Sequence, residues 1–161
     1  MKRIPSFGAA ATMLLVALAP LVIPWAANEN HAHIASPDSL GPPLKSLMVE
    51  LGLNMEKINA GIWREDYRLV SQGAAGIANH PQVSTQEQAI IREALGDQIK
   101  NFAQFDGLVH RTAAEIQRVA DTQRMDSILV LYSHLQNGCV SCHSGFRMHV
   151  RSALNAALPD R

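Results

Sequence analysis

Apolar residues recur at steps of three and four positions along most of the chain after Pro42, and this spacing restricts what the chain can fold into. It places apolar side chains along one face of an α-helix. No segment shows the convincing two-residue alternation of a strand. The pattern predicts four helices, over about residues 42–63, 66–79, 85–120 and 125–150. Because the connections between them are short, we expect an all-α fold, specifically an antiparallel up-down four-helix bundle.

Local signals set the expected ends of these helices. His80 precedes Pro81, and the residue before a proline avoids the helical conformation, so the second helix should end there. Ser84 and Glu87 have the spacing of a capping box, which favours the start of a helix. Gly107 falls within the third segment and leaves open whether that segment is one helix or two.

Two of the helices carry further patterning. The second has little side-chain bulk between Gly73 and Gly76, which indicates close contact with a neighbouring helix. The first should direct one apolar stripe toward the interior, made of Leu44, Met48, Leu51, Met55, Ile58 and Ile62.

Charge and cysteine content exclude several classes of protein. Lys and Arg number 14, Asp and Glu also 14, so the chain lacks the positive charge that nucleic-acid binding needs. Two cysteines are too few for a disulfide framework. No constellation of a catalytic acid, base or nucleophile stands out, so we do not expect an enzyme.

The first 27 residues are typical of a targeting segment. Lys2 and Arg3 precede an apolar stretch that contains no charged residue until Glu29. The stretch fits the core of a signal peptide, and it is also long enough for an uncleaved membrane anchor. Residues 28–41 are expected to form a linker, and we assign no site to His31 and His33 within it. In a bacterium this segment would direct the chain to the periplasm, either free or anchored to the inner membrane.

One motif carries chemistry. Residues 139–143 read Cys-Val-Ser-Cys-His, the C-x-x-C-H sequence at which a c-type haem is attached. On a helix, positions i, i+3 and i+4 share one face, so two thiols can reach the two vinyl groups on one porphyrin edge. His143 would then be the axial iron ligand beside Cys139 and Cys142. Export agrees with this reading, because bacterial c-type haems are attached outside the cytoplasm.

Other uses of the cysteine pair fit less well. A thioredoxin-like pair would need a βαβ context, and a structural zinc site would need two further ligands at finger-like spacing. A disulfide between cysteines three positions apart inside a helix is geometrically awkward.

A sixth iron ligand would have to come from upstream of the motif. If the first and last helices are antiparallel and straight, His143 is level with about residue 44, from which Met48 lies about 6 Å and Met55 about 16 Å along the axis. Met48 is therefore the better candidate, against the alternative that both methionines fill the core. Three further histidines are poorer candidates, because His80 ends its helix before a proline, His110 flanks the inward stripe, and His134 lies on the same helix as His143.

These residues resemble the class II c-type cytochromes, the family of cytochrome c′ and its methionine-ligated cytochrome c-556 relatives. The resemblance covers about residues 43–152, and its most specific part is C-x-x-C-H-x-x-F-R, from Cys139 to Arg147. It implies that Met48 supplies the sixth ligand, as in the low-spin members, and that Arg147 lies on the proximal side beside His143. Weaker matches are Leu47-Met48, Asn54-Met55 and Ile77 to Pro81.

The sequence therefore predicts an exported electron carrier with one covalent haem c and with redox proteins as partners. The alternative is a five-coordinate, cytochrome c′-like protein that binds nitric oxide or carbon monoxide through an iron that Met48 does not occupy. A third reading is a haem module docked to a membrane oxidoreductase. A homodimer and association with the membrane through the N-terminus are both left open.

Overall fold

The computed structural model describes residues 41–159, and its secondary structure there is entirely helical, with no strand. The all-α expectation is thereby confirmed. The predicted signal or anchor segment 1–27, nearly all of the predicted linker 28–41 and the last two residues lie outside the described residues. Along the chain the helices are α1 (Leu44–Trp63), α2 (Tyr67–Ala78), α3 (Thr85–Leu95), a 3₁₀ turn η1 (Gly96–Gln98), α4 (Ile99–Ala120) and α5 (Met125–Ala157).

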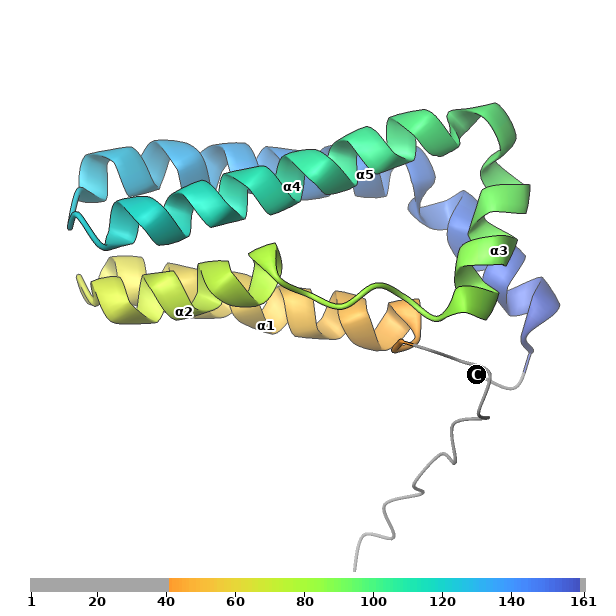
Figure 1. Cartoon of the computed structure of the whole chain (residues 1–161), viewed down its shortest axis with the longest axis horizontal. Helices are drawn as coiled ribbons and strands as arrows, with labels where there is room; N and C mark the ends of the chain where they lie inside the picture. The colour runs from red at the N-terminus through yellow and green to blue at the C-terminus, as the bar shows by residue number, and fades with distance from the viewer. Residues whose placement is uncertain (1–40, 160–161) are drawn as a thin grey trace, which may run out of the picture. The chain divides into compact units, whose positions relative to one another are not determined.

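The first two helices form a closely packed antiparallel pair, drawn in orange and yellow in Figure 1. Asp66 caps α2, its carboxylate accepting a hydrogen bond from the amide of Leu69 at 2.9 Å. A Cβ placed on Gly73 would lie 2.7 Å from the carbonyl oxygen of Asn54, which shows how near the two backbones approach. The expectation of close helix contact at the small residues of α2 is thereby confirmed.

The last two long helices, α4 and α5, pack along each other, and α4 also packs along α2. A first apolar cluster lies among these elements and α1, built mainly from branched aliphatic side chains. Its fully buried members include Ile58, Val70, Ile116, Ile128 and Leu135. Among the described residues, no contact of similar extent joins α1 to α5. The α1–α5 side is therefore the least closely packed.

The third predicted segment is two helices, and the break lies at Gly96 instead of Gly107. Gly96 has φ +49°, a left-handed conformation that suits glycine, whereas Gly107 lies inside α4. The break lets α3 turn away from α4 and pack against the C-terminal part of α5 (Figure 1). A second apolar cluster, formed by Ile91, Leu95, Phe146 and Val150, fills this contact.

The capping box is only half formed, and the other half joins α3 to α1. The hydroxyl of Ser84 accepts a hydrogen bond from the amide of Glu87 at 3.3 Å, as the spacing predicts. The carboxylate of Glu87 does not return to Ser84 and instead accepts from the amide of Leu44, in the first turn of α1. Ser84 in turn donates its own amide to the carbonyl of Pro42 at 3.0 Å. These contacts fix the start of α1 against α3.

Within residues 41–159, none of the helices has the length and apolar character that crossing a membrane requires.

Candidate functional site

The five residues of the C-x-x-C-H motif all lie inside α5, about midway along it. Cys139 and Cys142 are half-buried free thiols, and His143 is exposed to solvent. Cys139 packs against the first apolar cluster, whereas Cys142 packs against the second. The two thiols therefore lie where the two clusters adjoin.

Both thiols are held in their neutral form. Burial raises the pKa of the Cys139 thiol. The pKa of Cys142 is raised to about 11, mainly by burial, and further by the negative charge of Asp106 and by that of Cys139 once it ionises. At neutral pH these cysteines are therefore uncharged thiols.

Of the two candidate methionines in α1, neither is fully buried. Met48 is 38% exposed, and the buried residue at that turn is Leu47, at 2%. The expected inward stripe is thus wrong at Met48, because α1 is rotated so that Leu47 and Asn54 face the interior. Met55 packs against the first cluster, as the core-filling alternative has it.

Two contacts show which residues of α1 lie level with which residues of α5. The hydroxyl of Tyr132 in α5 donates to the carbonyl oxygen of Met55 in α1, at 3.5 Å. At the other end, Leu44 packs against the second cluster, which contains Phe146 of α5. Met48 lies between Leu44 and Met55 along α1, just as His143 lies between Phe146 and Tyr132 along α5.

Two further candidate side chains lie on the same helix as the motif. Arg147 is exposed and follows His143 by one helical turn, so the two lie on the same side of α5. His134 lines a shallow hollow of about 280 Å³ between α4 and α5, which does not include the cysteines. It is lined instead by Gly138 and Ser141, which neighbour the two cysteines along the chain.

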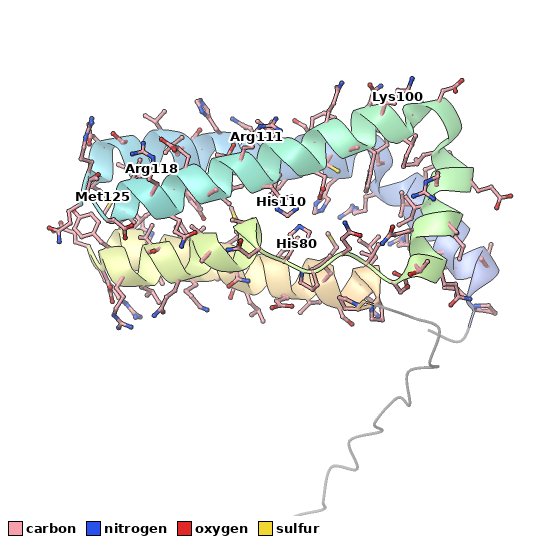
Figure 2. All side chains as sticks on the ribbon, in the orientation of Figure 1. His80, Lys100, His110, Arg111, Arg118 and Met125 are labelled. Atoms are coloured by element: carbon pink, nitrogen blue, oxygen red, sulfur yellow. The ribbon has the colours of Figure 1, made fainter. Side chains whose placement is uncertain are left out.

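One cluster is not evident from the sequence, and it brings together His80, Asp106 and His110. A potential ligand atom from each of the three lies within 4.8 Å of the others. Figure 2 shows the two labelled imidazoles near each other, between α2 and α4. The i, i+4 spacing of Asp106 and His110 on a helix was the available signal, but nothing in the sequence places His80 beside that pair.

The donor set in the middle of α5 fits a covalently attached haem. It offers two free, neutral thiols three positions apart and an adjacent accessible imidazole. Apolar clusters flank the thiols on both sides, as a porphyrin ring requires.

No family model, no curated protein and no solved structure matches this chain.

Proposed function

We propose that this protein is an exported c-type cytochrome that carries one covalent haem and transfers electrons. The single observation that carries the proposal is the placement of Cys139, Cys142 and His143 on one stretch of α5, with both thiols between two apolar clusters. In this proposal α1, α2, α4 and α5 are the four helices of an up-down bundle, and the haem is attached to the last of them.

The residues that would hold the haem divide the task between them. Cys139 and Cys142 would each add across one vinyl group, the sulfur bonding to one carbon and the thiol hydrogen passing to the other, so no oxidant is needed. His143 would bind the iron through an imidazole nitrogen. Bound in this way, the haem would supply a one-electron ferric–ferrous couple whose potential depends on the axial ligands and on burial.

Met48 is our candidate for the sixth ligand. In α1, Met48 lies between Leu44, which packs against the cluster of Phe146, and Met55, which accepts a hydrogen bond from Tyr132. In α5, His143 lies between the same two residues, Phe146 and Tyr132. Side chains in a helix lean toward its N-terminus, so in antiparallel helices those of Met48 and His143 lean toward each other. A methionine ligand stabilises ferrous iron and raises the potential, which suits an electron carrier.

Arg147 has a supporting role in this proposal. Its guanidinium lies one turn beyond His143 on the same side of α5, so it would add positive charge beside the proximal ligand. A cation there disfavours the ferric state electrostatically and would raise the potential further.

One observation favours a second candidate function. Met48 is 38% exposed, so its sulfur is only partly within the apolar interior. If Met48 does not bind iron, the haem would be five-coordinate, and the protein would bind nitric oxide or carbon monoxide as cytochrome c′ does. Docking of the haem domain to a membrane oxidoreductase would be compatible with either ligand set.

The proposal is tested by expressing the full chain in bacteria that attach c-type haem, then measuring intact mass and the pyridine haemochrome spectrum. We expect one covalent haem per chain in the exported fraction, and none in the Cys139→Ser, Cys142→Ser variant. His143→Ala should keep the covalent haem and lose the native iron spectrum, whereas the matched His134→Ala should change neither. A chain exported without haem would overturn the proposal.

A further inference from the structure

His80, Asp106 and His110 form a side-chain cluster that the proposed haem function does not use. Asp106 and His110 lie one turn apart on α4, and His80 lies just beyond the end of α2. The carboxylate of Asp106 faces Nε2 of both imidazoles: its Oδ1 is 3.9 Å from Nε2 of His80, and its Oδ2 is 3.7 Å from Nε2 of His110. The cluster thus joins the end of α2 to α4, two helices that are separated along the chain by α3.

In both histidines, a backbone carbonyl oxygen holds Nδ1, so that Nε2 faces Asp106. Nδ1 of His110 lies 2.7 Å from the carbonyl oxygen of Ala78, and Nδ1 of His80 lies 2.9 Å from that of Pro81. A carbonyl oxygen can only accept, so each Nδ1 carries its proton, and in the neutral ring Nε2 keeps a lone pair. Both lone pairs are on the side of Asp106. Metal-binding histidines characteristically donate their other ring nitrogen to a carbonyl in this way.

The three side chains need only a small movement to surround an ion. Bonds of about 2.0–2.1 Å in a tetrahedral arrangement separate neighbouring ligand atoms by about 3.3 Å. The two separations between Asp106 and the imidazoles exceed this value by roughly half an ångström, and no two of the three ligand atoms are more than 4.8 Å apart. The side chain of Asp106 is 55% exposed, so it can rotate to close that difference, and an ion can enter from solvent. Three protein ligands leave a fourth position for water.

We propose that His80, Asp106 and His110 bind a divalent transition-metal ion of the Zn²⁺ class. Two imidazoles and one carboxylate are the donors that Zn²⁺ accepts readily, and Ca²⁺ or Mg²⁺ would need more oxygen ligands than the cluster offers. The ion would fix the end of α2 more firmly to α4, where the two imidazoles already contact each other with ring centres 4.3 Å apart and His110 is hydrogen-bonded to the carbonyl of Ala78.

The test uses the full chain as isolated after export, with His31→Ala and His33→Ala in every sample to remove the other closely spaced histidines. Zinc binding is measured by equilibrium dialysis and metal analysis, with free Zn²⁺ as the probe. We expect one equivalent bound. His110→Ala and Asp106→Asn should each weaken binding at least tenfold, while the exposed His149→Ala should not. Zinc should also raise the melting temperature of the parent and not that of Asp106→Asn.

Two outcomes would overturn the proposal. One is zinc affinity that is unchanged in both His110→Ala and Asp106→Asn; because Asp106 is exposed, its variant should fold even if His110→Ala does not. The other is a change in the haem absorption spectrum of His80→Ala or His110→Ala, since that would mean that these imidazoles bind the haem iron instead. The second outcome would leave the covalent haem assignment itself intact.

Discussion

The hydroxyl of Tyr132 in α5 donates a long hydrogen bond, of 3.5 Å, to the carbonyl oxygen of Met55 in α1. It joins two helices that otherwise pack less closely than any other neighbouring pair of long helices. Counting along both helices from this contact, the eleven residues to His143 correspond to about 16 Å, level with about residue 44 of α1. The helix ends place His143 at the same level of α1. Met48 is therefore within about 6 Å of His143 along the helix axis.

Replacing Met48 by Ala should change the spin state of the haem. With Met48 as sixth ligand, we expect the wild-type protein to have a low-spin spectrum and to take up little carbon monoxide. Met48→Ala should become high-spin in the ferrous state and bind the gas stoichiometrically. Visible absorption with and without carbon monoxide measures both.

The matched control for this substitution is Met55→Ala. It removes a methionine that packs against the first cluster, so it should lower stability by about 1–3 kcal/mol and leave the haem spectrum unchanged. A wild-type protein that is already high-spin and binds carbon monoxide would favour the gas-binding function over electron transfer.

Adding a methyl group at Gly73 should destabilise the α1–α2 pair. The new Cβ would lie 2.7 Å from the backbone oxygen of Asn54 and 2.9 Å from the backbone nitrogen of Ile58, neither of which can move alone. We expect Gly73→Ala to lower the free energy of unfolding by about 1–3 kcal/mol. Gly145→Ala, with nothing within 4 Å, should instead raise it by about 0.5–1 kcal/mol. Denaturant unfolding of both variants checks this, and equal midpoints would contradict it.

Removing the carboxylate of Glu87 should loosen the start of α1. This buried side chain accepts from the Leu44 amide, at the positive end of the α1 dipole. Glu87→Ala should cost about 1–3 kcal/mol in unfolding free energy, because it leaves the amide without its partner. The exposed Glu93→Ala on the same helix should change stability by less than about 0.5 kcal/mol. Hydrogen exchange at the Leu44 amide measures the local opening of the first turn of α1. Unchanged protection of this amide in Glu87→Ala would contradict the role of Glu87 in holding the start of α1.

The stability of the haem-free full chain should fall at alkaline pH because of Cys142. The pKa of the Cys142 thiol is about 11 in the folded protein and 9.0 for a free thiol, so its contribution to stability is intact below about pH 9 and is lost as pH rises toward 11. Two pKa units correspond to about 2.7 kcal/mol, and partial exposure reduces this to about 1–2 kcal/mol. Cys142→Ser should flatten the curve of unfolding free energy against pH over that range. Identical curves for the wild-type chain and Cys142→Ser would disprove that Cys142 causes the loss of stability.

Much of the helical order could be predicted because it depends on local signals. The apolar spacing gave the long helices, and His80-Pro81 and Ser84 marked two of their ends close to where the structure has them. The possible break in the third segment was expected at Gly107, whereas the structure has it at Gly96. Only Gly96 adopts a left-handed conformation, and that choice depends on the contact of α3 with α5, which no local pattern encodes.

The candidate site could be predicted only in part for the same reason. The C-x-x-C-H motif lies within a few residues of one helix, so its shared face follows from helical geometry. The orientation of Met48 depends on how α1 is rotated against α2, and there Leu47 and Asn54 took the interior positions. The approach of His80 to His110 spans thirty residues and depends on the packing of α2 against α4.

The division of Cys139 and Cys142 between two apolar clusters has a consequence for how the protein unfolds. Two cores that share a single long helix can open one at a time, as separate cooperative units with separate free energies. A rigid ring bonded to one thiol of each core would link them, so that neither could open alone. Haem attachment would then convert two folding units into one, and local exchange at the α3 end would slow to the rate of global unfolding.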